Sequence, residues 1–112
     1  MNKKIKYKLI DSKKPIDVKL QDESVWLSLM DLTQLFGRDK SVISRHINNI
    51  FKEEELDRNS TVAKIATVQN EGGRKIERTI NHFNLDVIIS VGYRVKSKRG
   101  TKFRIWATNI IK

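Results

Sequence analysis

Polar side chains suited to nucleic acid recur on one side of a helix that the sequence predicts from about residue 39 to Ile50. At about 100° per residue, Ser41, Arg45 and Asn48 fall opposite a stripe of three isoleucines. Arginine can form a forked contact with guanine or phosphate, asparagine can pair with an adenine edge, and serine can reach a phosphate. We therefore predict that this side of the helix reads bases in the major groove of duplex DNA.

Basic residues extend the same surface. Arg38 and Lys52 share the predicted polar side, and no acidic residue occurs between Lys40 and Lys52. The alternative is a solvated helix face that happens to be basic and rich in amides, because loose matches to DNA-binding helix pairs are frequent. Together with two residues of a hairpin described below, the predicted DNA contacts are Arg38, Lys40, Ser41, Ser44, Arg45, Asn48, Lys52, Arg74 and Lys75.

A shorter helix is predicted just before this one. Ser28 can cap it, with Asp31 as the partner in a capping box, and leucines recur behind them at helical spacing. Gly37 then supplies the permissive backbone that a tight corner needs, and Asp39 or Ser41 can cap the second helix. Two helices that meet at a glycine predict a helix-turn-helix.

Alternating apolar residues predict two β-hairpins. Residues 4–10 and 16–20 form the first hairpin, and a short third strand at 25–27 leads into the helix pair. Residues 61–68 and 75–83 form the second hairpin. Strands are thus expected both before and after the helix pair along the chain, which indicates an α+β fold.

The tip of the second hairpin is glycine-rich and basic. Gly72 and Gly73 make the turn, and Arg74 and Lys75 follow it. These two cations would suit a wing that lies along a groove or backbone of DNA, although an ordinary exposed hairpin tip explains them equally well. The acidic run from Glu53 to Asp57 is predicted to be a solvated loop that faces away from nucleic acid.

The C-terminal part predicts two antiparallel helices. Asn84 can cap the first, which should end near Val95, and a linker over residues 96–100 leads to a last helix that opens at Thr101. The expected fold is α+β, with a helix-turn-helix core, an N-terminal β-hairpin, a second wing-like β-hairpin and this helix pair. We expect residues 1–112 to form a single DNA-binding-like domain, the N-terminal part of a longer protein, because apolar periodicity still runs at the last residues.

Composition favours a polyanionic partner. The chain of 112 residues suits one domain, and its 23 lysines and arginines against 13 acids give a net charge of +10. There is no cysteine, no apolar run of membrane-span length and no secretory signal pattern, so we expect a cytoplasmic protein without a membrane partner. An acidic membrane surface would also attract this charge.

The residues predict no catalysis. The two histidines, His46 and His82, are far apart in sequence, and neither has metal-ligand spacing or a nucleophile motif beside it. No phosphate-binding glycine motif occurs either. We therefore expect no cofactor, no metal and no small-molecule substrate.

Two segments carry a family resemblance. VWLSLMDLTQLFGRDKSVISRHINNIF (residues 25–51) and FNLDVIISVGYRVKSKRGTKFRIWAT (residues 83–108) closely resemble the RhuM family of bacterial, virulence-associated proteins. Members of that family are longer than this chain and are similar, more distantly, to the DNA-binding domains of phage antirepressors of the Bro and KilA type. The resemblance implies a role in transcriptional or phage-related regulation but no settled biochemical activity.

The predicted function is double-stranded DNA binding through a helix-turn-helix with a basic wing. The alternative is a protein-interaction or oligomerisation module that uses the last helix, with Phe103, Trp106, Ile110 and Ile111 as its apolar surface. Both are compatible with a homodimer, because helix-turn-helix proteins usually bind as dimers. Single-stranded RNA is less favoured, because the chain carries no aromatic ladder on a strand.

Overall fold

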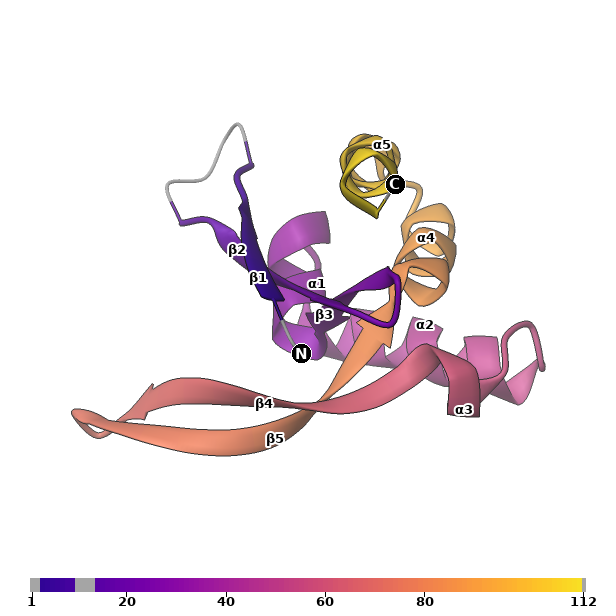
Figure 1. The fold of residues 1–112 in the computed structure, drawn as a ribbon. Helices are drawn as coiled ribbons and strands as arrows, with labels where there is room; N and C mark the ends of the chain where they lie inside the picture. The colour runs from indigo at the N-terminus through magenta and orange to yellow at the C-terminus, as the bar shows by residue number, and fades with distance from the viewer. Residues whose placement is uncertain (1–2, 10–13, 112) are drawn as a thin grey trace.

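The protein has an α+β fold, in a computed structural model that describes residues 3–9 and 14–111 (Figure 1). The described elements are β1 (Lys3–Tyr7), β2 (Ile16–Gln21), β3 (Ser24–Ser28), α1 (Leu29–Phe36), α2 (Lys40–Lys52), α3 (Arg58–Thr61), β4 (Val62–Glu71), β5 (Arg74–Asn84), α4 (Leu85–Arg94) and α5 (Lys98–Ile111). The predicted fold class, α+β, is therefore confirmed.

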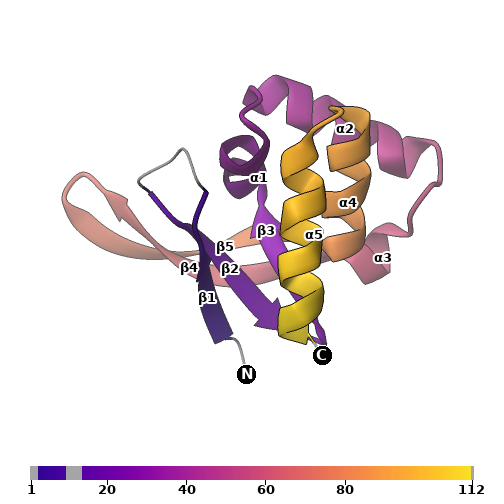
Figure 2. The same ribbon diagram turned by 90° about the horizontal axis from the view of Figure 1, so that it is seen from above.

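The strands form one antiparallel sheet in the order β1-β2-β3-β5-β4. Strand β3 pairs with β5 only from Trp26↔Asn84 to Ser28↔His82, because the chain leaves the sheet at Ser28 to begin α1. Beyond these residues, no other strand in the described part of the chain pairs with the β4–β5 hairpin. We call its outer part, residues 66–79, the arm, and it projects from the body in two views (Figures 1 and 2).

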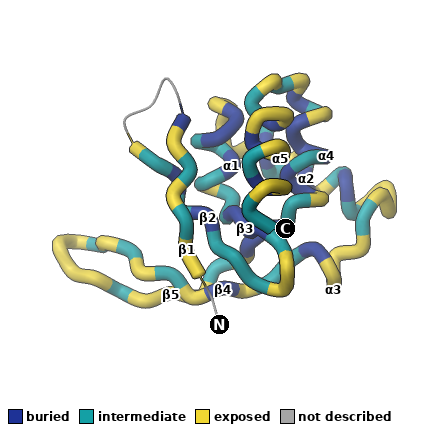
Figure 3. Tube along the Cα trace, turned by 45° about the horizontal axis from the view of Figure 1, so that its top comes forward, coloured by how far each residue is buried: buried dark blue, intermediate teal, exposed yellow. Residues whose placement is uncertain are grey.

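The arm is longer than the sequence predicted. Its strands continue to Glu71 and resume at Arg74, whereas residues 69–74 were expected to turn. Gly72 and Gly73 have φ values of 58° and 78°, so both adopt the left-handed conformation of a two-residue hairpin turn. Two glycines are therefore enough to reverse the chain. Most of the arm is exposed (Figure 3).

The helices enclose the core on the other side of the body from the arm. Helix α4 packs between α2 and α5, and α1 packs against β2, β3 and α2. The buried side chains that meet there come from every one of these helices. They include Leu32, Leu35 and Phe36 of α1, Ile43, Ile47 and Ile50 of α2, Val87, Ile88 and Val91 of α4, and Phe103 and Ala107 of α5.

Helix α1 begins as its sequence predicts. The Ser28 hydroxyl accepts a hydrogen bond from the Asp31 amide (3.2 Å), and the Asp31 carboxylate accepts one from the Ser28 amide (2.9 Å). Gly37 follows the helix with φ 62°, and Asp39 caps α2. The sequence had left Asp39 and Ser41 open as alternatives for this cap.

The predicted linker between the last two helices is wrong in extent. Helix α5 begins at Lys98 and not at Thr101, so Gly100 lies inside its first turns rather than in a linker. The reason is close packing: a Cβ at Gly100 would lie 3.3 Å from the Phe36 ring and 3.4 Å from the Cα of Gly92. Gly100 therefore allows two helices to pack closely and does not interrupt α5.

The acidic run after α2 is also more ordered than predicted. Glu53 and Glu55 each accept a hydrogen bond of 2.8 Å from the guanidinium of Arg94 in α4. Asp57 caps the short helix α3 by accepting from the Ser60 amide at 3.1 Å. Most of the run stays exposed, as expected, but it is fixed by an ion-pair network and a helix cap.

Candidate nucleic-acid interface

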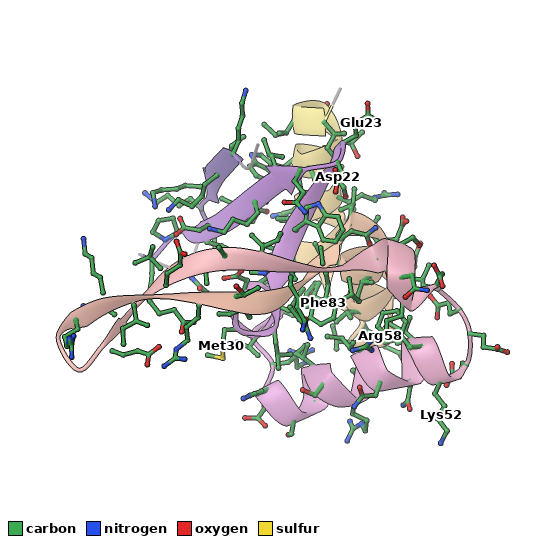
Figure 4. All side chains as sticks on the ribbon, turned by 60° about the horizontal axis from the view of Figure 1, so that its bottom comes forward. Asp22, Glu23, Met30, Lys52, Arg58 and Phe83 are labelled. Carbon is green, nitrogen blue, oxygen red and sulfur yellow. The ribbon has the colours of Figure 1, made fainter. Side chains whose placement is uncertain are left out.

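Helix α2 has one buried and one exposed side. Ile43, Ile47 and Ile50 are buried, with Ile47 only 4% exposed. On the opposite side lies an exposed stripe, which we call the α2 stripe; its residues are Ser41, Arg45, Asn48 and Lys52. Lys52 extends from the end of α2 away from the rest of the protein (Figure 4). The helical phase predicted from the sequence therefore agrees with the burial.

The first residue of the α2 stripe is held by the helix cap. The Asp39 carboxylate accepts hydrogen bonds from the Ser41 amide (3.2 Å) and the Ser41 hydroxyl (2.6 Å). The hydroxyl hydrogen bond is the main reason why the pKa of Asp39 lies below its usual value. The Ser41 hydroxyl is thus engaged as a donor, and Asp39 places one negative charge at this end of the stripe.

Three of the predicted contacts in or beside α2 lie off the α2 stripe. Arg38 precedes α2, and its guanidinium donates to the backbone carbonyls of Val95 (3.2 Å) and Phe36 (3.4 Å). It ties the corner between α1 and α2 to the end of α4. Ser44 is half-buried at the margin of the stripe, whereas Lys40 is exposed in the first turn.

The two basic residues at the tip of the arm face opposite ways. Arg74 lies opposite Glu71 in the strand register, and Lys75 lies opposite Asn70. Because neighbouring residues of a strand point to opposite faces, only Lys75 shares the face of Phe83, which enters the core at the base of the arm. In Figure 4, Phe83 lies between the base of the arm and α2.

Sequence reasoning missed two further arginines that have partners in the structure. Arg58, at the start of α3, places its guanidinium 5.1 Å from the centre of the Phe51 ring at the end of α2 (Figure 4). Arg78 in the arm binds the Glu71 carboxylate through two nitrogens, one of them at 2.8 Å. Nothing in the sequence marks Arg58, because a four-residue helix has no detectable period.

The nearest cluster of acids is directed away from the α2 stripe. Glu53 and Glu55 bind Arg94 in α4, and Glu55 also accepts a hydrogen bond from the Ser90 hydroxyl. The Ser90 hydrogen bond is the largest cause of the lowered pKa of Glu55, and Arg94 adds to it. These two carboxylates are therefore partly neutralised within the protein.

The two histidines differ in how far they are buried. His82 is only 2% exposed, and its Nδ1 lies 2.9 Å from the Ile80 carbonyl oxygen, whereas His46 is half-buried on α2. Burial is the main cause that lowers the pKa of both imidazoles. Among residues 3–9 and 14–111, no group of three or more potential metal ligands comes together.

No helix in the described part of the chain is long and apolar enough to cross a membrane.

Comparison with known proteins links the second half of the chain to one family. Residues 60–112 match the family model described as Virulence protein RhuM family, a region that contains the arm, α4 and α5. The match includes residues 83–108, the second of the two segments that carry the resemblance, while residues 25–51 lie outside it. No curated protein and no solved structure matches the chain. The resemblance predicted from the sequence is therefore confirmed over residues 60–112, which match the model of the Virulence protein RhuM family.

Proposed function

We propose that the protein binds double-stranded DNA, with α1 and α2 acting as a helix-turn-helix and the arm as its wing. The observation that carries this proposal is the α2 stripe. Ser41, Arg45, Asn48 and Lys52 are exposed together on a helix whose other side is buried in the core. A helix anchored in this way holds base-reading side chains in fixed positions, which is what specific recognition requires.

Charge supports the same function. The net charge of +10 attracts a polyanion, and two of the acids that follow α2, Glu53 and Glu55, are bound to Arg94. Arg58 and Lys40 add exposed cations at the two ends of α2. Phosphate contacts of this kind position a protein on duplex DNA, while the arginine and asparagine of the stripe supply sequence readout.

The arm is suited to act as the wing, but of its two predicted contacts we favour Lys75 over Arg74. It projects from the body (Figure 1), and the strand register places Lys75 on the face of Phe83. We assign the wing contact to Lys75 first, because Arg74 points to the opposite face. The role we propose is non-catalytic binding in transcriptional or mobile-element regulation, with a homodimer as the binding unit.

The competing function, protein interaction through the last helix, has less support. Phe103 is fully buried, and the Tyr7 ring of β1 packs against it and against Trp106, with centroid distances of 5.0 and 4.9 Å. The aromatic residues of α5 are therefore used inside the protein. They do not form the exposed apolar patch that this function needs.

Binding to an unrelated duplex at several salt concentrations tests the proposal. We expect log K to fall against log salt with a slope of about −0.9 for each phosphate contacted, and about four to eight contacts for one module of this size. The double variant Lys40→Glu/Lys52→Glu should weaken binding strongly. Lys3→Glu/Lys8→Glu is the matched control, because it makes the same charge change at exposed positions of the N-terminal hairpin. Equal losses in the two variants, or no binding at low salt, would reject the proposal.

A further inference from the structure

Helices α4 and α5 enclose a groove on their outward sides. It has a volume of about 330 Å³. Ile89 and Tyr93 of α4 line one wall, Thr101 and Arg104 of α5 line the other, and Lys96 and Lys98 lie at the end where the two helices join. The groove is separate from the α2 stripe, and none of the contacts proposed above uses it.

The centre of the groove is apolar, and its floor is formed by glycines. Tyr93 is 78% exposed, although it carries a large ring, and Ile89 beside it is half-buried. Gly92 and Gly100 form the floor, where a Cβ on either would lie 3.3 Å from the Phe36 ring. An exposed tyrosine beside an aliphatic residue and a glycine floor offers a place for one apolar side chain of a partner.

The rim of the groove carries positive charge without compensation. From Val87 to Ile111 the chain contains no acid and six lysines and arginines. Two of the six are engaged: Arg94 binds Glu53 and Glu55, and Arg99 donates to the Leu35 carbonyl. The three cations that line the groove form no ion pair within the described part of the chain; they are Lys96, Lys98 and Arg104.

The position of the groove separates it from bound DNA. Helix α4 lies between α2 and α5, and the buried side of α2 faces the core that contains α4 (Figures 1 and 2). The α2 stripe points the opposite way. A straight duplex against that stripe would therefore leave the α4–α5 groove open.

The protein itself provides an example of the matching chemistry. On another side of α4, the acidic run after α2 binds Arg94 through Glu53 and Glu55, and Leu56 packs half-buried against the core. There, carboxylates bind a cation and an apolar side chain packs beside them. The groove has the cations and the apolar surface but no such partner among the described residues. A phosphate backbone would meet the cations but has no side chain to fill the apolar centre.

We propose that the α4–α5 groove binds an acidic segment of a partner protein. One apolar side chain of that segment packs against Tyr93 over the glycine floor. Its carboxylates pair with Lys96, Lys98 and Arg104. This surface is independent of the α2 stripe, so the protein can hold DNA and an acidic partner at the same time.

The test uses the whole chain and a short fluorescein-labelled peptide, rich in glutamate with two central leucines. Arg104→Glu and Tyr93→Ala should each weaken binding at least about tenfold, the loss typical of one central contact. Lys102→Glu is the matched control, because Lys102 is exposed on the same helix but does not line the groove. It should change the affinity by less than about twofold. Circular dichroism confirms that each variant is folded.

Other outcomes would overturn the proposal. Equal losses for Arg104→Glu and Lys102→Glu would show only attraction by net charge. Equal binding of a peptide whose leucines are replaced by serine would exclude the apolar anchor. If Arg104→Glu abolishes duplex binding while the peptide still binds, the groove contacts nucleic acid. Because duplex binding is measured in parallel on every variant, loss of the α2-based function is distinguished from loss of the groove.

Discussion

A methyl group on Gly92 of α4 would lie 3.5 Å from the Cα of Gly100 in α5, and one on Gly100 would lie 3.4 Å from the Cα of Gly92. Both methyl groups would also lie 3.3 Å from the Phe36 ring of α1. Three helices therefore meet at one point. Arg38 and Arg99 strengthen this junction, because their guanidiniums donate to the Val95 and Leu35 carbonyls across it.

A larger side chain at Gly100 should separate these helices. We expect Gly100→Val to lower the free energy of unfolding by about 1 to 3 kcal/mol, because overpacking outweighs the gain in helix propensity. Thr108→Val is the control, since it places the same side chain at an exposed position of α5. Urea denaturation measures both variants. A stable Gly100→Val protein would mean that the helices can move apart at no cost.

The buried side of α2 makes a second prediction. Ile47→Asp should unfold the protein, because an unpaired carboxylate at a site only 4% exposed costs several kcal/mol, a large share of typical total stability. Asn48→Asp adds the same group one residue further on, at an exposed position, and should leave the fold intact. Circular dichroism distinguishes the two results. A folded Ile47→Asp protein would contradict the packing of α2.

The turn between β2 and β3 offers a stabilising change. Asp22 and Glu23 have φ values of 50° and 57°, a left-handed conformation that costs a residue other than glycine about 1 kcal/mol or more (Figure 4). Asn-Gly is the preferred pair for such a turn. We expect Asp22→Asn/Glu23→Gly to raise the free energy of unfolding by about 1 kcal/mol. Unchanged stability in denaturant would show that the turn is not strained in solution.

The local features of the fold were predictable because they depend on neighbouring residues. The capping box of Ser28 and Asp31 and the buried isoleucines of α2 follow from spacing alone. The sequence prediction was wrong where contacts between distant residues determine the structure. Gly100 was expected in a linker, whereas it packs against Gly92 and Phe36 inside α5. The hydrogen bond from Arg38 to the Val95 carbonyl could not be predicted from the sequence either.

The candidate site was predictable to the same extent. Exposure of Arg45 and Asn48 follows from the helix period, so the α2 stripe could be listed in advance. The register of the arm could not be predicted from the sequence. In this register, Arg74 and Lys75 point to opposite faces of the arm. Arg58 contacts Phe51 only because a short helix and the ion pairs of Arg94 fold the chain back after α2.

Stability should depend on pH through His82. Burial lowers the pKa of His82, and its hydrogen bond to the Ile80 carbonyl and the charge of Asp31 oppose this only in part. An unfolded chain takes up the proton near the ordinary histidine pKa of about 6.5, whereas the folded protein takes it up at lower pH. The free energy of unfolding should therefore be highest above about pH 7 and fall as the pH drops below about 6.5.

The comparison of His82→Gln with His46→Gln identifies the source of this dependence. Both pKa values are lowered, but His46 is only half-buried, so His82→Gln should remove more of the slope between about pH 8 and 5.5. Burial raises the pKa of Asp31, which therefore acts with the opposite sign at lower pH. Denaturation midpoints across this range measure the slope. Equal slopes in wild type and His82→Gln would assign the effect elsewhere.

The last prediction concerns base reading by α2. A specific site is first selected from random duplexes, and binding is then compared on that site and on a scrambled control. Arg45→Ala and Asn48→Ala should each cost about 1 to 3 kcal/mol on the selected site and little on the control, because a base contact carries sequence preference. Both residues are exposed, so neither change should affect folding.

Phosphate contacts should behave differently. Lys40→Ala and Lys52→Ala should weaken binding to both duplexes alike and flatten the salt slope by about one each. If Arg45→Ala and Asn48→Ala also lower affinity equally on both duplexes, α2 contacts only the backbone. If neither changes binding while Arg74→Ala abolishes it, the tip of the arm is the reader, although Arg74 lies on the face of the arm opposite Lys75. Lys75→Ala then separates the two faces of the arm, because a wing that contacts DNA through the face of Phe83 should depend on Lys75 and not on Arg74.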